Sequence, residues 1–200
     1  MTIITRQKKY QVIYADPPWQ YRNGSIQGAA RNHYQTMGDA DLYRLPVQEL
    51  TAEDCILFLW CTFPKMPEAL ALIEAWGFTF KTTAFVWVKQ NKSGDGYFFG
   101  LGWWTRSNAE ICLLAVKGKP KRKSAGISQL IISPVEEHSK KPDQTREKIV
   151  ELVGDVPRLE LFARQKAEGW DSWGNEVDSD ITLGRKESKG KEETGKSPVE

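Results

Sequence analysis

The chain has 200 residues, 40% of them hydrophobic and 27% charged, which is the composition of a globular protein with one sizeable core. The net charge of +2 is too small to identify a nucleic-acid binder, so a basic surface must come from local clustering. Eight tryptophans indicate aromatic surfaces that stack on flat ligands, or core and interface packing. Because neither a signal peptide nor an apolar run of membrane-spanning length is recognisable, we expect a soluble, cytoplasmic protein without membrane attachment.

The cysteines and histidines show no metal-binding pattern. Cys55, Cys61 and Cys112 lie in apolar stretches without a paired motif, so we expect reduced core residues rather than disulfides or metal ligands. His33 and His138 also lack the spacing of metal ligands. The sequence therefore predicts no metal site.

The first predicted element is a strand at residues 10–15. It is a short apolar run that ends at Asp16, Pro17 and Pro18, and proline does not continue a strand ladder. Residues 20–37 are polar and glycine-containing, which predicts a long loop of the kind that is often functional.

The middle of the chain alternates between strands and a helix. Apolar or β-branched runs predict strands at residues 55–60, 78–88 and 109–116. Helical spacing of apolar residues predicts a helix over residues 64–76. Residues 90–107 form a glycine- and aromatic-rich loop, which we interpret either as a mobile cover for a bound base or as a packed loop.

The last third contains two short strands and a helix. The strands are predicted at residues 129–132 and 157–162, and proline at the start predicts a helix over residues 142–153. From residue 178 onward apolar residues nearly vanish, which predicts a disordered tail over residues 178–200.

This alternation predicts one α/β domain over residues 1–177, with a mostly parallel sheet and helices on both faces. Ligands of such sheets bind beyond the carboxyl ends of the strands. We therefore expect Asp16 and the segments that follow Trp60 and Phe162 to lie along one edge.

The motif Asp16-Pro17-Pro18-Trp19 carries the chemistry that this edge suggests. On its own it is a strand cap, but the aromatic fourth residue favours a binding site for an amine on a flat ring. The Asp16 carboxylate and the Pro17 carbonyl can accept the two amine hydrogens, the prolines fix the backbone, and Trp19 offers a stacking face. An adenine in a duplex would have to be flipped out to reach this site.

Six segments in order resemble the MT-A-seventy family of adenine methyltransferases: YADPPW, LFLWCT, EICLLAVKG, HSKKPD, RLELFAR and SWGNE. The resemblance covers roughly residues 10–177. It implies a single-domain Rossmann-like methyltransferase fold, S-adenosyl-L-methionine as cofactor, and the exocyclic N6 amine of adenine as methyl acceptor. It also implies that Asp16, Pro17, Pro18 and Trp19 are catalytic.

The same resemblance implies four cofactor-binding residues. Lys141 matches a lysine that binds the cofactor's carboxylate, and Arg164 matches an arginine near the ribose. Asn175 and Glu176 match residues near the adenosine end, although the eukaryotic enzymes commonly have Gln in place of Glu176.

Two basic segments are candidates for contacts with phosphate groups. The run at residues 117–123 is either a solvated loop or a phosphate-tracking surface, and an adenine-containing substrate favours the second interpretation. The candidate nucleic-acid-binding residues are Arg22, Arg31, Lys119, Lys121, Arg122 and Lys123.

Two other functions compete with adenine methylation. In the first, the chain is a catalytically inactive homologue that binds nucleic acid or a partner subunit. In the second, it methylates another amide or amine, such as the side-chain amide of protein glutamine. The intact motif and Lys141 disfavour the first alternative, and Asp16 disfavours the second, because glutamine methyltransferases usually have Asn there. DNA is favoured over RNA because the chain resembles bacterial and phage family members and shows no RNA-binding module.

Overall fold

A computed structural model describes residues 8–21, 36–102, 104–137 and 139–184. Its strands are β1 (Tyr10–Ala15), β2 (Thr51–Cys61), β3 (Thr79–Gln90), β4 (Ala109–Lys117), β5 (Leu130–Pro134), β6 (Arg158–Leu161) and β7 (Asp171–Trp173). Its α-helices are α1 (Asp39–Arg44), α2 (Met66–Ala75) and α3 (Gln144–Val153), and the short 3-10 helices are η2 (Val47–Glu49) and η3 (Phe63–Lys65).

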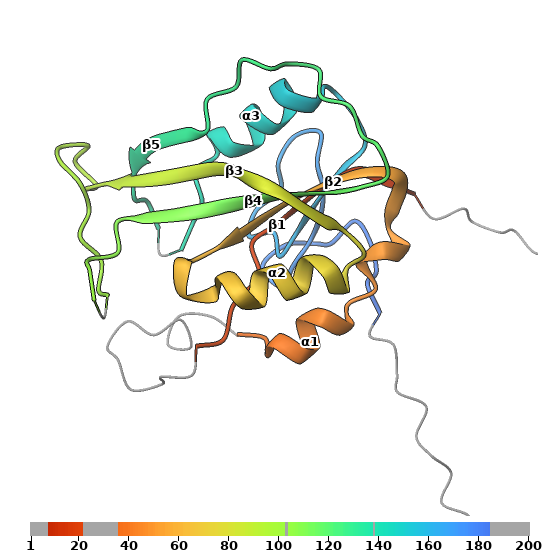
Figure 1. Ribbon diagram of the computed structural model, residues 1–200, viewed down its shortest axis with the longest axis horizontal. Coiled ribbons are helices and arrows are strands. Elements are labelled where there is room, and N and C mark those ends of the chain that lie inside the picture. Colours follow the sequence, from red (N-terminus) through yellow and green to blue (C-terminus); the bar gives the residue numbers. More distant parts are fainter. Residues whose placement is uncertain (1–7, 22–35, 103, 138, 185–200) are drawn as a thin grey trace, which may run out of the picture.

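The strands form one curled sheet in the order β5-β3-β4-β2-β1-β6-β7 (Figure 1). β1 pairs in parallel with β2 and β6, β6 with β7, and β3 with β5. β4 pairs antiparallel with both β2 and β3. Within this sheet only β4 therefore runs against the common direction, and the predicted mostly parallel sheet is confirmed.

The reversed strand determines which loops lie near the ends of the other strands. β4 begins at the edge where β1, β2 and β3 end, so the β3–β4 loop lies at that edge. β4 ends at the opposite edge, where Lys117 pairs with Cys55 and its ammonium donates to Thr51 at 2.6 Å. The basic run at residues 117–123 consequently starts at the edge where β1 and β2 begin.

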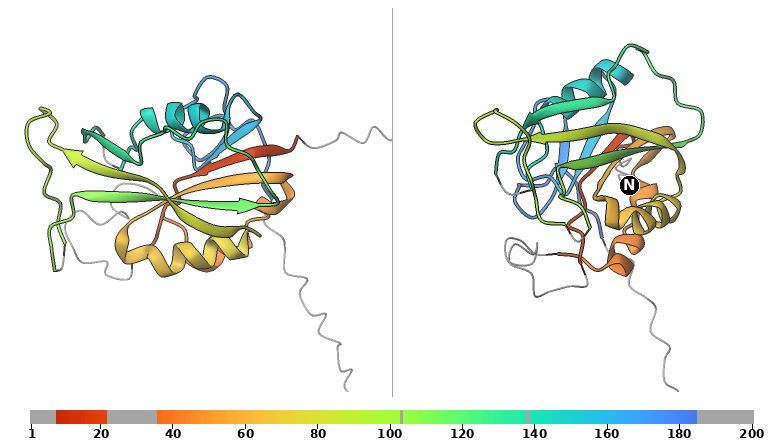
Figure 2. Two further views of the ribbon diagram at one scale, coloured as in Figure 1. Left: turned by 45° about the horizontal axis from the view of Figure 1, so that its top comes forward. Right: turned by 60° about the vertical axis from the view of Figure 1, so that its left-hand side comes forward.

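Alternating strand residues divide the core into two clusters. Ile13 belongs to one cluster, together with Leu72 of α2, and Tyr14 belongs to the other, together with Ile149 of α3. This two-residue period follows from the pleat, which points successive side chains to opposite faces. Figure 2 shows the twist of the sheet between the segments that supply these clusters.

Short elements are where structure and sequence-based prediction differ. The helix α1 and the strand β7, with six and three residues, were not predicted. Elements of this length contain too few residues to display a periodic pattern. The three cysteines are buried and unpaired, as expected.

The chain beyond β7 remains in contact with the domain. The Asp180 carboxylate accepts hydrogen bonds from the Ser172 backbone N–H at 2.9 Å and from its hydroxyl at 3.0 Å. Ile181 and Leu183 pack against the core cluster that contains Ile13 and Leu72 of α2. The boundary of the predicted tail at residue 178 stays a prediction, and residues 185–200 lie outside the described part of the chain. Among the described residues, no helix is long and apolar enough to span a bilayer.

Candidate active site

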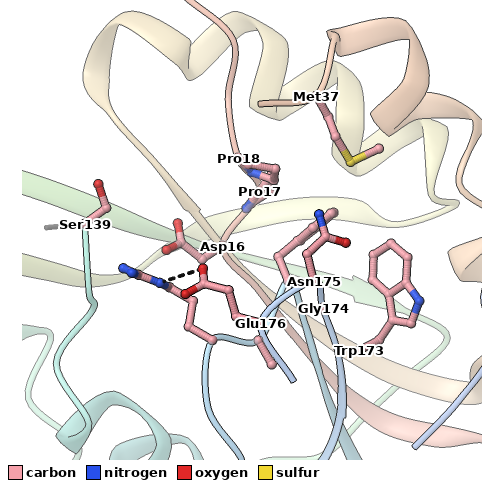
Figure 3. Close-up of a pocket in the computed structure, with 12 residues that line it drawn as sticks. Asp16, Pro17, Pro18, Met37, Ser139, Trp173, Gly174, Asn175 and Glu176 are labelled. Atoms are coloured by element: carbon pink, nitrogen blue, oxygen red, sulfur yellow. Dashed lines mark hydrogen bonds and ion pairs between the residues drawn. The ribbon is translucent and has the colours of Figure 1, made fainter. Parts of the chain in front are cut away.

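A cavity of about 330 Å³ lies at the carboxyl ends of β1, β6 and β7 (Figure 3). Asp16 follows β1, residues 162–164 follow β6, and residues 174–176 follow β7, and all of these line the cavity. This placement confirms the expected edge for Asp16 and for the segment after β6. The lining residues are Asp16, Pro17, Pro18, Met37, Ser139, Phe162, Ala163, Arg164, Trp173, Gly174, Asn175 and Glu176.

The two carboxylate oxygens of Asp16 have different environments. Oδ2 accepts a hydrogen bond from the Lys141 ammonium at 2.8 Å. Within the described residues, Oδ1 has no hydrogen-bond donor. Burial raises the pKa of Asp16, and Lys141 opposes that rise. One oxygen is thus fixed by a cation while the other is available to a ligand.

Lys141 is enclosed by acceptors. Besides Asp16, its ammonium lies 3.3 Å from Oε2 of Glu110 and donates to the Ser139 carbonyl at 3.2 Å. Burial opposes protonation of Lys141, but the two carboxylates outweigh it and raise its pKa. Burial would also raise the pKa of Glu110, but Lys141 and Lys89 together lower it. Because Lys89 also forms an ion pair with Glu110, four alternating charges form a chain that leads to the cavity.

Two lining residues have unusual backbone conformations. Ser139 and Phe162 both have φ of 62°, in the left-handed region that residues with side chains rarely adopt. Among the described non-glycine residues, no others have positive φ. Such strain is concentrated at functional sites, where the surroundings hold it in place.

The loop after β7 approaches the chain after β6 very closely. A Cβ atom added to Gly174 would lie 2.2 Å from the Ala163 carbonyl oxygen and 2.8 Å from its nitrogen. The Ala163 N–H donates to the Trp173 carbonyl at 3.0 Å. Only glycine fits at residue 174, so the register of this loop, and with it the position of Asn175, is fixed.

Polar and aromatic groups face the cavity from these two loops. Nε of Arg164 lies 3.0 Å from Oε1 of Glu176, and the amide of Asn175 is the neighbouring polar group (Figure 3). The rings of Phe162 and Trp173 meet edge to face with centroids 5.5 Å apart. Charged hydrogen-bonding groups and aromatic rings are the chemistry that binds a nucleoside.

Trp19 is placed differently from Pro17 and Pro18. Its side chain is only 4% exposed, its Nε1–H donates to the Trp60 carbonyl at 3.1 Å, and it does not line the cavity. The Lys65 ammonium lies 5.9 Å from the centre of its ring. Trp19 thus anchors the segment after Asp16 in the core, and the stacking face expected from the sequence is not presented to the cavity.

The structure brings together most, but not all, of the residues predicted from the sequence. Asp16, Pro17, Pro18, Arg164, Asn175 and Glu176 share the cavity, and Lys141 reaches it through Asp16. The exposed basic residues Lys119, Lys121, Arg122 and Lys123 follow the far end of β4. The predicted loop at residues 20–37 is described only at its ends, and Arg22 and Arg31 lie outside the described residues.

Sequence reasoning did not assign the charge partners Glu110 and Lys89, or the aromatic pair Phe162 and Trp173. Glu110 is the first residue of the EICLLAVKG segment. An acidic residue at the start of an apolar strand could have indicated that Glu110 belongs to the site. Lys89 has no such signal, because only the pairing of β3 with β4 brings it next to Glu110.

The structure is that of an α/β protein with a mostly parallel sheet, and a cavity of about 330 Å³ and the D-P-P segment lie together at the carboxyl edge of its strands. Residues 10–176 match the sequence family described as MT-A70, and the chain belongs to this family. The chain is 37% identical over 192 residues to the Type II methyltransferase M.MunI of Mycoplasma sp, covering 86% of this chain and 79% of that protein.

Eukaryotic proteins are similar over the same region. The chain is 30% identical over 174 residues to the N(6)-adenosine-methyltransferase catalytic subunit METTL3 of Homo sapiens. It is 31% identical over 171 residues to the N(6)-adenosine-methyltransferase MT-A70-like of Arabidopsis thaliana. These matches cover 85% and 84% of this chain but span only 28% and 24% of the relatives.

Proposed function

We propose that this protein transfers a methyl group from S-adenosyl-L-methionine to the exocyclic N6 amine of adenine in DNA. The observation that carries the proposal is the Asp16 carboxylate, which lines the cavity, is held at Oδ2 by Lys141 and has no hydrogen-bond donor to Oδ1 among the described residues. A fixed acceptor of this kind suits an amine hydrogen. We also propose that the sheet and its helices form a Rossmann-like methyltransferase domain with helices on both faces, over residues 1–177.

The chemistry of the cavity fits the cofactor. Its volume of about 330 Å³ lies in the range of small-molecule sites. Arg164, Glu176 and Asn175 would hold the ribose and the adenosine end, and Phe162 and Trp173 supply aromatic surface. When bound, S-adenosyl-L-methionine supplies an activated methyl group on a positively charged sulfur.

Two different partners are assigned to Lys141 in this proposal. Family resemblance assigns it to the cofactor's carboxylate, whereas in the structure its ammonium lies near Asp16, Glu110 and the Ser139 carbonyl. An ammonium has three N–H donors, and three acceptors already surround it. A cofactor carboxylate bound by Lys141 would therefore replace one of these acceptors.

The role of Asp16 and Pro17 is to orient the acceptor amine. Oδ1 of Asp16 and the Pro17 carbonyl would accept the two amine hydrogens, which makes the nitrogen lone pair available to the methyl carbon. The Pro17 carbonyl already accepts the Trp19 N–H at 2.8 Å and retains a second lone pair. Asp16 and Pro17 would hold the amine in place while the bound cofactor would supply the methyl group, and the amine proton that the methyl group replaces would leave to solvent.

One observation supports DNA as the substrate. The match to the Type II methyltransferase is 37% identical and spans most of both chains, whereas the matches to the adenosine methyltransferases are 30–31% identical. The basic residues Lys119, Lys121, Arg122 and Lys123, together with Arg22 and Arg31, are proposed to contact phosphate groups.

The direct test incubates the protein with methyl-labelled S-adenosyl-L-methionine and, in separate reactions, unmethylated DNA and RNA, followed by digestion to nucleosides. We expect label in N6-methyldeoxyadenosine. Label in N6-methyladenosine alone would show that the substrate is RNA and not DNA. Cofactor binding without label in either polymer would contradict the proposed methylation of adenine.

The variants Asp16→Asn and Asp16→Ala test whether the Asp16 carboxylate is the acceptor that orients the amine. Both should lower the methylation rate by about 100-fold or more, because loss of one preorganised polar group at a reacting centre typically costs this much. Unfolding in urea should remain cooperative, since Asp16 follows a strand that is held on both sides. Near-normal turnover of Asp16→Ala would remove Asp16 from the mechanism.

A further inference from the structure

The loop between β3 and β4 exposes large apolar side chains. Trp104 is fully exposed, and the exposed fractions of Phe99, Leu101 and Tyr97 are 69%, 68% and 53%. These values contradict the interpretation of the loop as packed on the domain. A cluster of exposed apolar side chains of this size marks a surface that contacts another molecule.

The end of this loop has a defined shape. The Gly100 N–H donates to the Ser107 carbonyl at 2.9 Å, and the Ser107 N–H donates back at 3.3 Å. A Cβ atom on Gly100 would lie 2.5 Å from the Ser107 carbonyl oxygen, and one on Gly102 would lie 2.0 Å from that of Thr105. The two arms therefore approach at a distance that only glycine permits. We call residues 100–102 and 104–107 the tip.

The tip projects from the edge of the sheet that carries Asp16. Figures 1 and 2 show the loop extending beyond the ends of β3 and β4. Three residues after the tip, Glu110 pairs with Lys141, which holds Asp16. Lys92 and Arg106 are exposed on the same loop and supply positive charge beside the apolar residues. Apolar surface flanked by positive charge is complementary to stacked bases between phosphate groups.

We propose that the tip is a wedge that enters duplex DNA beside the target adenine through Leu101 and Trp104. This inference rests on the proposed function. The amine of a stacked, paired adenine cannot reach Asp16 until the base leaves the helix, and this opening is unfavourable. Apolar side chains that occupy the vacated stacking position offset the opening, as in proteins that insert apolar wedges between base steps.

If the tip is a wedge, replacing its apolar side chains should lower methylation of duplex DNA more than methylation of single-stranded DNA. Initial methylation rates are measured on a DNA library that contains all six-base sequences, supplied as duplex and as single strands. Trp104→Ala and Leu101→Ala should each lower the duplex-to-single-strand rate ratio at least tenfold, whereas Trp104→Phe should retain most of it. Phe80→Ala is the matched control, because Phe80 is also exposed but pairs with Ala115 toward the opposite edge. A ratio in Trp104→Ala equal to that of the unaltered protein would overturn the proposal.

A second measurement separates the wedge from the methylation reaction. Permanganate oxidises thymines that have lost stacking and pairing, and mapping this oxidation on the duplex library detects base opening without cofactor. We expect opening with the unaltered protein and none with Trp104→Ala. Opening that depends on Trp104, in a protein that methylates nothing, would support the wedge and refute the proposed function. Equal opening by both proteins, or a change only in self-association on sedimentation, would refute the wedge.

Discussion

Lys141 forms ion pairs with two partly buried carboxylates, whereas the carboxylates that pair with its neighbour Lys140 are about half exposed. Lys141 is 10% exposed and pairs with Asp16 and Glu110, whereas Lys140 pairs with Glu136 and Asp143 near the surface. Removing a buried counterion leaves a charge that water cannot stabilise, whereas surface pairs contribute little. The two adjacent lysines therefore form a matched pair for testing how Asp16 is kept ionised.

Lys141→Met should shift the acidic limb of the methylation rate profile to higher pH. Burial raises the pKa of Asp16 and Lys141 opposes the rise, so removing Lys141 raises this pKa further. Since only the ionised carboxylate accepts amine hydrogens at both oxygens, activity is lost as pH falls through the pKa. The direction of the shift follows from the loss of the nearby positive charge, which favours the ionised carboxylate.

The measurement is kcat/KM as a function of pH, with Lys140→Met as the control whose acidic limb should stay in place. Calorimetry with S-adenosyl-L-methionine adds a second readout, because Lys141→Met should weaken cofactor binding more than DNA binding. An unchanged acidic limb in Lys141→Met would show that Lys141 does not stabilise the Asp16 carboxylate.

At the scale of elements, the loop after β7 shows how a backbone contact defines a binding site. The SWGNE segment was identified in the sequence by its resemblance to the family, and in it Asn175 directly follows Gly174. The structure gives the reason for glycine, since the Ala163 backbone occupies the space of a side chain. Sequence alone could not supply this reason, because residues 163 and 174 meet only through the pairing of β6 with β7.

Gly174→Ala should impair cofactor binding and stability together. The added methyl group would lie 2.2 Å from the Ala163 carbonyl oxygen, so the two loops must separate. We expect a loss of about 1–3 kcal/mol in the free energy of unfolding, typical of overpacking, and weaker binding of S-adenosyl-L-methionine. Urea denaturation and calorimetry measure the two effects.

Gly126→Ala is the control for this substitution. Nothing lies within 4 Å of a Cβ atom added at Gly126, and its φ is not in the left-handed region. This variant should unfold at the same urea concentration as the unaltered protein and bind the cofactor equally well. A stable Gly174→Ala variant with unchanged cofactor affinity would show that the close approach does not shape the site.

At the scale of the whole molecule, the sequence located most strands but not the direction of each. Apolar or β-branched runs located β1, β2, β3, β4, β5 and β6, and the mostly parallel sheet placed Asp16 and residue 162 at one edge. The direction of β4 could not be predicted from the sequence, because the same apolar run is compatible with a parallel and with an antiparallel strand. That reversal places the start of the basic run at the opposite edge of the sheet from the cavity.

The basic run can therefore contribute to DNA binding only at a distance from the reacting base. Lys119, Lys121, Arg122 and Lys123 are exposed, and among the described residues none of their side chains forms an ion pair. Replacing all four by Gln should weaken duplex binding and make it less dependent on salt, while kcat at saturating DNA stays the same. Each lost phosphate contact should lower the slope of log K against log salt by about 0.9.

Fluorescence anisotropy of labelled duplex DNA at several salt concentrations measures this slope, and single-turnover methylation measures the chemical step. Lys81→Gln is the control, because Lys81 is exposed at the start of β3 and its replacement removes one comparable charge outside the run. An unchanged slope in the fourfold variant would identify the run as a solvated turn. Phosphate contacts would then have to come from the edge that carries Asp16 and the tip, where Lys92 and Arg106 are exposed.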